Sequence, residues 1–295
     1  MIFVSTGGEY HKAASETAMD FYNHGIAGVE LSGGAFSTSY QADLLALPKE
    51  LTLQVHNYFP PPALPFVLNL ASNNLKIAEQ GMCHVRRAIR TAVLLRRPIY
   101  SFHAGFRIDP QVSELGKKLG KYKLIDRGIA LELFGERLLI LAEEARQEGV
   151  KLLIENNVLN IANLSIYGED PLLLTHPDEI SSFMASMPSN VGLLLDVAHL
   201  KVSAKSLEFN LKQAHELLKK WIKGYHLSDN DGNADSNECV RSDSWFWNVL
   251  IPNLDYYSLE VYQTPIPKLV EQYKYVAMKL SEISNSKKYG DKIDY

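Results

Sequence analysis

The chain has 295 residues, 46% of them hydrophobic and 22% charged, which is a globular composition on a chain too long for most single sandwiches or small bundles. Thirty basic and 34 acidic residues leave a net charge of −4, and no sustained basic run is present, so we expect no nucleic-acid partner. The two cysteines lie far apart and form no CxxC pair, which argues against both a disulfide framework and a thiolate zinc site.

The N-terminal segment, MIFVSTGGEYHK, lacks the basic flank and long apolar stretch of a signal peptide. No later segment approaches the roughly 18 uninterrupted apolar residues of a membrane span. We therefore expect a cytoplasmic protein with no membrane partner.

Short β-branched or aliphatic runs alternate with long amphipathic segments along the chain, which is typical of a parallel sheet built from βα units. The runs that predict strands are 2–6, 28–32, 51–57, 98–103, 150–156, 191–196, 222–227 and 256–261. Eight such units close a TIM barrel.

The segments between these runs carry apolar residues at helical spacing with charges on the opposite side. The predicted helices are 70–96, 127–148, a helix that opens at His176-Pro177 and ends before Pro188, 206–220 and 265–284. No linker rich in Pro, Gly or Ser divides the chain. We predict one α/β domain, a single (β/α)8 TIM barrel over 1–284, followed by a polar tail over 285–295.

Four polar residues stand directly after apolar strand runs in the second half of the chain, and in a barrel of this type such positions face one mouth. They are Glu155, Asp196, His226 and Glu260. Three carboxylates and one imidazole suit one divalent ion, Mn²⁺ or Mg²⁺ first, with Co²⁺ or Zn²⁺ as alternatives. The competing interpretation is that each acid caps a helix or pairs with a basic group in a loop.

Histidines also end earlier strands, or follow a strand closely. His56 lies in LQVHNYF and His103 in SFHAGF, while His199 follows Asp196 by three residues in DVAH. Each is a candidate for binding substrate or a second metal, and a hydrogen-bonded structural histidine is the alternative. The remaining five are expected on the surface: His11, His24, His84, His176 and His215.

The ordered series VHNY, FHAG, LLIENN, LLLDVAH, GYHLSDNDG and SLEVY resembles the xylose-isomerase-like TIM-barrel superfamily of sugar isomerases and epimerases, related dehydratases and type IV apurinic-site endonucleases. The resemblance implies that Glu155, Asp196, His226 and Glu260 bind the divalent ion. It also implies that Glu155 and Glu260 form the acid/base pair and that His199 contacts a substrate oxygen. In the nuclease branch, His56 and His103 would be further metal ligands in a three-metal cluster.

The sequence departs from two branches of that superfamily. The nuclease pattern expects Asp-x-His where Asp235-Ser236-Asn237 stands, and the loop 229–243 carries a charge of −4 that opposes a phosphodiester backbone. Some keto-sugar epimerases have a basic residue where Gly232 stands here. We therefore expect an isomerase or epimerase that acts by proton transfer next to a carbonyl through an enediolate. A sugar or polyol dehydratase, and a non-catalytic sugar-binding barrel, remain alternatives.

The expected partner is a small sugar, and an unphosphorylated one is favoured because the loops after the seventh and eighth strands contain no Gly-rich turn. The segment 107–127 is nevertheless basic, and Arg107, four residues past His103, is the member that we predict to contact substrate. A solvated loop is the alternative for this segment. An exposed apolar helix face is compatible with a homodimer.

Overall fold

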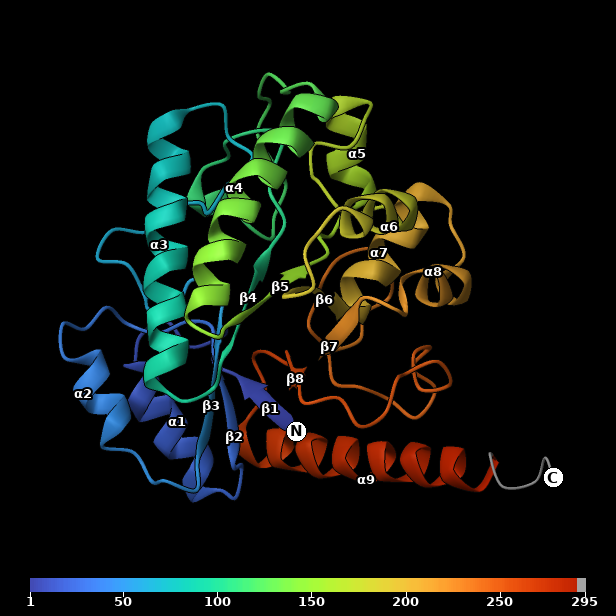
Figure 1. Cartoon of the computed structure of the whole chain (residues 1–295). Coiled ribbons are helices and arrows are strands. Elements are labelled where there is room, and N and C mark those ends of the chain that lie inside the picture. Colours follow the sequence, from blue (N-terminus) through green and yellow to red (C-terminus); the bar gives the residue numbers. More distant parts are fainter. Residues whose placement is uncertain (291–295) are drawn as a thin grey trace.

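Eight parallel strands form a closed barrel in which each strand pairs with its neighbours in sequence and β1 pairs with β8 (Figure 1). The strands are β1 (Ile2–Ser5), β2 (Gly28–Leu31), β3 (Thr52–His56), β4 (Ile99–His103), β5 (Lys151–Glu155), β6 (Val191–Asp196), β7 (Ile222–Leu227) and β8 (Tyr257–Leu259). Each lies within a run that the sequence predicts as a strand, so the predicted α/β TIM barrel is confirmed. The structure is a computed structural model that describes residues 1–290, with side chains described through Ser286.

Helices surround this barrel (Figure 1). They are α1 (Ala14–Asn23), α2 (Tyr40–Leu45), α3 (Leu75–Leu94), α4 (Arg127–Gln147), α5 (Ile161–Tyr167), α6 (Pro177–Ala185), α7 (Val197–Leu207), α8 (Leu211–Leu218) and α9 (Ile266–Gly290), together with a 3₁₀ turn at Val112–Glu114. The two longest central helices have N-caps that the sequence supplies. Asn74 accepts the backbone N–H of Lys76, and Asp126 accepts that of Ile129.

The predicted helix over 206–220 is wrong in its bounds. Helix α7 begins immediately after β6, breaks at Glu208, whose φ is 58°, and is followed by the separate α8. The start escaped prediction because no loop separates strand from helix: Asp196 ends β6 and is also the N-cap of α7. Helices α1, α2 and α5 were not predicted either, and the last two are only 6 and 7 residues long.

Side chains alternate along each strand between the barrel interior and the helix layer. Phe3, Leu153, Leu194 and Tyr256 pack together as an apolar layer inside the barrel. Two residues further along the same strands stand Ser5, Glu155, Asp196 and Ser258, all of them buried. The interior is thus apolar where the strands begin and polar where they end.

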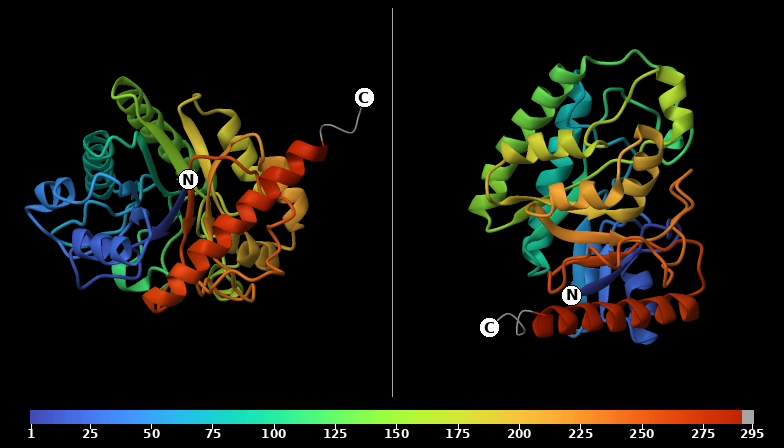
Figure 2. Two further views of the ribbon diagram at one scale, coloured as in Figure 1. Left: turned by 90° about the horizontal axis from the view of Figure 1, so that it is seen from below. Right: turned by 90° about the vertical axis from the view of Figure 1, so that its right-hand side faces the viewer.

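Helix α9 lies across the end of the barrel at which the chain starts, beside the N-terminus (Figures 1 and 2). Its buried residues Leu269, Val276 and Leu280 belong to the main core. The helix extends to Gly290, past the start of the predicted polar tail at 285, and the rest of that tail, 291–295, lies outside the described residues. Among the helices of the described chain, none has the length and apolarity needed to cross a membrane.

Two of the histidines expected on the surface are buried. His84 on α3 donates from Nε2 to the carbonyl of Asn57, and His215 on α8 bonds to the hydroxyl of Tyr225. Both lie on the inner face of an amphipathic helix. An imidazole whose nitrogen is hydrogen-bonded can be buried there and pack as an aromatic ring.

Candidate metal centre

The four strand-end residues predicted as metal ligands meet at one point. Glu155 ends β5, Asp196 ends β6, His226 lies near the end of β7, and Glu260 follows β8. All four are buried, and each offers one ligand atom within 4.8 Å of the others. The barrel brings them together because parallel strands deliver their ends to the same mouth.

His226 Nδ1 lies at the centre of this arrangement. It is 3.0 Å from Glu155 Oε1, 3.3 Å from Glu260 Oε2 and 3.9 Å from Asp196 Oδ2. Metal–ligand bonds of about 2.1 Å in an octahedron place adjacent ligands about 3.0 Å apart and opposite ligands about 4.2 Å apart. The observed spacings fall within that range.

Two carboxylate oxygens in the cluster are buried and have no hydrogen-bond partner. They are Glu155 Oε2 and Asp196 Oδ2. A buried and unpaired carboxylate oxygen is costly unless a cation or proton compensates it. The donor set and the unpartnered oxygens together fit a divalent ion.

The carboxylates are held so that one oxygen of each faces His226. Asp196 Oδ1 accepts the backbone N–H groups of Ala198 and His199, which leaves Oδ2 for the cluster. Glu260 Oε1 accepts the hydroxyls of Tyr262 at 3.0 Å and Ser5 at 3.4 Å, which leaves Oε2 for the cluster. Helix capping and metal binding, which the sequence posed as alternatives for an acid, are therefore compatible at Asp196.

The charges of the cluster shift its pKa values in opposite directions. Burial, followed by the charges of Asp235 and Glu155, raises the pKa of Asp196 to about 7, although His199 opposes that shift. Burial also acts to raise the pKa of Glu155, but the imidazoles of His103 and His226 outweigh it and hold that pKa well below its usual range. The Asp196 carboxyl, with its raised pKa, would be stabilised in its charged form by a nearby cation.

The predicted substrate-binding histidines His56 and His103 lie beside the cluster. His56 Nε2 and His103 Nδ1 are each 3.4 Å from the unpartnered Glu155 Oε2, and the three side chains form a second potential ligand group. His56 is buried, whereas 29% of the His103 side chain is exposed. Burial lowers the pKa of His103 to about 4, so its imidazole is neutral at pH 7.

His199, in the first turn of α7, also reaches the cluster. Its Nδ1 lies 2.9 Å from the carbonyl of Asn156, so it carries the hydrogen there, and its Nε2 lies 3.2 Å from Asp235 Oδ2. In the sequence, Asp235 stands out only as part of a departure from the nuclease pattern. Its pairing with His199 could not be predicted, because it depends on how the long loop after β7 folds.

Glu30 was missed as a site residue. It is fully buried in β2, its Oε2 lies 3.0 Å from His226 Nε2, and with His56, His226 and Glu260 it forms a further potential ligand group. The signal was present, since Glu30 stands near the end of a predicted strand just as the four ligands do. Only histidines were considered among the early strands.

The structure does not bring Arg107 to the cluster. Its guanidinium is buried and donates to Glu169 Oε2 at 2.7 Å, to the carbonyl of Asp170 at 2.7 Å and to that of Ile125 at 3.0 Å. These contacts tie together the loops after β4 and β5. Arg107 is thus neither beside the predicted ligands nor solvated, as the alternative for the segment 107–127 expected, but buried in contacts between two loops.

The acidic loop after β7 is partly neutralised by its surroundings. Asp229 is buried and pairs with Lys201 from α7 at 2.6 Å and with Arg241 at 3.2 Å. Lys201 lies outside the segment whose charge of −4 was counted. The field of this loop at the mouth is therefore weaker than the sequence alone indicates.

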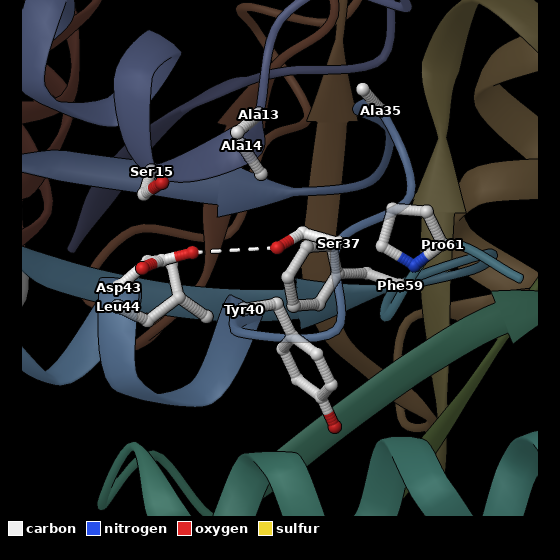
Figure 3. A pocket seen from close by; sticks show the side chains of 10 residues that line it. All are labelled: Ala13, Ala14, Ser15, Ala35, Ser37, Tyr40, Asp43, Leu44, Phe59 and Pro61. Carbon is white, nitrogen blue, oxygen red and sulfur yellow. Dashed lines mark hydrogen bonds between the residues drawn. The ribbon is translucent and has the colours of Figure 1, made fainter. Parts of the chain in front are cut away.

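Two hollows lie apart from the cluster. The first, of about 10 Å³, lies beside Tyr40 and Phe59, and Ser37 bonds to Asp43 at its edge (Figure 3). It has room for no more than about one water molecule. The second is an open groove of about 590 Å³ between α7 and the loop after β7, near Lys205 and Trp245.

The fold and the cluster define a (β/α)8 barrel with a carboxylate–imidazole site at its strand ends. The chain belongs to the xylose isomerase-like TIM barrel family, whose model matches residues 21–250. A comparison with curated proteins finds no match.

Solved structures share this fold. A D-tagatose 3-epimerase-like protein superposes with a TM-score of 0.71 at 20% identity, over 97% of this chain and 98% of that one. L-ribulose 3-epimerase gives a TM-score of 0.69 at 14% identity, over 100% and 99% of the two chains. The family 2 AP endonuclease from Brucella melitensis superposes with a TM-score of 0.58 at 17% identity, over 90% of this chain and 94% of that one. At these identities the likeness is one of fold.

Proposed function

We propose that this protein is a divalent-metal-dependent sugar isomerase or epimerase, with an unphosphorylated sugar as substrate. One observation carries the proposal: Glu155 and Glu260, from strands on different sides of the barrel, approach the same nitrogen of His226 at 3.0 and 3.3 Å. Two carboxylates around one centre are what reversible proton transfer next to a carbonyl requires. Family membership and the sugar epimerases among structures of this fold support the same class.

Glu155, Asp196, His226 and Glu260 would hold the ion, with Mn²⁺ or Mg²⁺ favoured by the three carboxylates. When bound, the ion would act as a Lewis acid that stabilises negative charge on the substrate oxygens. Proton transfer and substrate positioning would be carried out by the protein side chains.

In the proposed reaction one glutamate removes the proton from the carbon next to the carbonyl, and the C–H electron pair forms the enediolate. In an epimerase, the other glutamate returns a proton to the opposite face of the same carbon. In an isomerase, a glutamate returns a proton to the former carbonyl carbon, and the hydroxyl proton moves to the former carbonyl oxygen. The hydroxyls of Tyr262 and Ser5 fix the orientation of Glu260. Burial of both glutamates keeps bulk water from the enediolate during the transfer, and their carboxyl protons exchange with solvent between turnovers.

His56, His103 and His199 would bind substrate hydroxyl or carbonyl oxygens, since their rings line the same cluster. The neutral imidazole of His103 can donate one hydrogen bond to a sugar oxygen. Asp235 and the acidic loop beyond it favour hydroxyl groups over a phosphate near His199.

The deciding experiment incubates Mn²⁺-loaded protein with a panel of ketoses, aldoses and inositols in D₂O. Proton NMR and mass spectrometry should show one deuteron incorporated next to the carbonyl with no loss of water. Glu155→Gln and Glu260→Gln should each abolish the exchange, while the surface variant Glu16→Gln should retain it. An unsaturated product would instead identify a dehydratase, and no turnover with an unchanged ligand response in Glu155→Gln would indicate a binding protein.

An abasic-site endonuclease is a second candidate, because imidazoles beyond those of a one-metal site gather here. His56 and His103 contact Glu155, and His199 pairs with Asp235, as a site with more than one metal would need. Asn237 still stands where that branch has histidine. Cleavage of an abasic-site duplex by the metal-loaded protein, without sugar turnover, would decide for this alternative.

A further inference from the structure

We propose that Glu30 is a positioning residue that fixes two imidazoles of the candidate metal centre, His226 directly and His56 through two hydroxyl groups. This inference rests on the proposed function only in taking the cluster to bind a divalent ion. Glu30 is outside the four predicted ligands, and its Oε2 contacts His226 on Nε2, whereas those ligands approach Nδ1; its carboxylate also lies within reach of His56 and Glu260.

The direct contact sets the orientation of His226. Glu30 is fully buried, and its Oε2 lies 3.0 Å from His226 Nε2. A carboxylate has no hydrogen to donate, so Nε2 must carry one. Nδ1, which bonds to Glu155 Oε1 at 3.0 Å, is then the nitrogen that a metal would take over, because it faces Glu155, Glu260 and Asp196. Carboxylates commonly orient metal-binding histidines in this way.

A chain of hydrogen bonds runs from the same carboxylate oxygen to His56. Tyr256 donates its hydroxyl hydrogen to Glu30 Oε2 at 2.5 Å. Ser101 Oγ lies 2.9 Å from the Tyr256 oxygen and 3.0 Å from His56 Nδ1. All of these side chains are buried, so no solvent can reorient them.

The hydrogens in this chain have only one consistent order. The Tyr256 hydrogen is used on Glu30, so its oxygen accepts from Ser101, and Ser101 in turn accepts from His56 Nδ1. His56 Nε2 is then the nitrogen that this chain leaves unused, and it points at Glu155 Oε2 from 3.4 Å. His226 Nδ1 and His56 Nε2 are thus the nitrogens that face the cluster, while the bonds that lead back to Glu30 hold hydrogens on the other nitrogen of each ring.

The test compares Mn²⁺ affinity by calorimetry and the visible spectrum of bound Co²⁺ in wild type and variants. Glu30→Gln keeps the shape but removes the charge, and we expect Mn²⁺ binding about 10- to 100-fold weaker with a shifted Co²⁺ band. Tyr256→Phe cuts the branch to His56 alone, and nitrogen NMR of labelled histidines in the Zn²⁺-loaded protein should show a changed His56 tautomer with His226 unaltered. The matched control is Tyr257→Phe, whose hydroxyl bonds to the Ile251 carbonyl outside this chain.

The outcomes separate this inference from the proposed function. Weaker Mn²⁺ binding in folded Glu30→Gln supports the inference even if no sugar is turned over. Wild-type affinity and an unchanged Co²⁺ spectrum in Glu30→Gln overturn it, even if the wild type proves to be an epimerase. Should Glu30→Gln fail to fold, an unchanged His56 tautomer in Tyr256→Phe overturns the relay. A wild type that binds neither Mn²⁺ nor Co²⁺ overturns both proposals.

Discussion

A hydrogen bond from the backbone of His199 to Asp196 gives the two carboxylate oxygens of Asp196 different roles. Asp196 Oδ1 accepts the backbone N–H of His199 at 2.7 Å, while Oδ2 remains without a hydrogen-bond partner, 3.8 Å from Nε2 of the same histidine. The start of helix α7 therefore holds one oxygen in place, and the other is aimed into the cluster.

This division predicts that Asp196→Asn separates capping from metal binding. Asparagine caps helices about as well as aspartate, so the metal-free variant should be at least as stable as the wild type. Its Mn²⁺ affinity should fall by about 100-fold or more, since loss of a ligand should cost at least as much as loss of a supporting residue. Denaturant unfolding and calorimetry measure the two effects. Asp196→Ala, which loses the cap as well as the ligand, should also lower the unfolding free energy by about 1 kcal/mol. Wild-type Mn²⁺ affinity in Asp196→Asn would exclude Asp196 as a ligand.

Metal removal should destabilise the protein, because the buried carboxylates then lose their compensating charge. Saturation at about 100 times Kd stabilises a folded protein by roughly 2.7 kcal/mol, which corresponds to a rise in Tm of about 5 °C for a chain of this size. Differential scanning calorimetry with EDTA and then with excess Mn²⁺ measures the change. The same titration of Glu155→Gln should show little shift, and an equal shift there would place the binding elsewhere.

Buried His84 predicts a loss of stability in mild acid. Burial, and secondarily Arg87, lower its pKa from 6.5 to about 4, although its bond to the Asn57 carbonyl opposes the shift. The unfolded chain takes up the proton first, so the contribution is complete above about pH 6.5 and is lost as the pH falls toward 4. The full effect is about 3 kcal/mol. Urea unfolding across this pH range should show a shallower dependence in His84→Gln than in wild type, with exposed His24→Gln as the control. Identical slopes in all three proteins would contradict the assignment.

Arg107 should behave as a structural residue. Arg107→Met removes the side-chain donor of the Ile125 carbonyl and one of the two donors of the Asp170 carbonyl, which keeps Arg127, and the expected cost is about 1–3 kcal/mol of unfolding free energy. KM for the sugar substrate should change by less than about twofold, because removing a group that does not contact the substrate leaves binding intact. The neighbouring exposed lysine variant Lys121→Met is the control for loss of positive charge. A large rise in KM at unchanged Tm would restore the predicted contact with substrate.

Strand positions, and the meeting of the four predicted ligands at one mouth, could be predicted from sequence because both depend on local pattern. An apolar run such as Leu152 to Ile154 marks a buried strand wherever it occurs, and the residue after it, Glu155, must emerge at the carboxyl end. Helix α7 was not predictable in the same way, since its N-cap is the last residue of a strand. Glu30 could have been found by the same rule as Glu155.

The sequence by itself therefore determined the barrel, the end of the barrel that carries the site, and the chemical character of that site. Only the tertiary structure decided which nitrogen of His226 faces the ligands, that Glu30 contacts the other nitrogen, and that Arg107 is held by Glu169 away from the cluster. The physical reason is the distance along the chain between the residues that interact. Periodicity and strand-end position are properties of neighbouring residues, whereas the partner of a buried polar atom is set by residues hundreds of positions away that the closed barrel brings into contact, as it brings Tyr256 to Glu30.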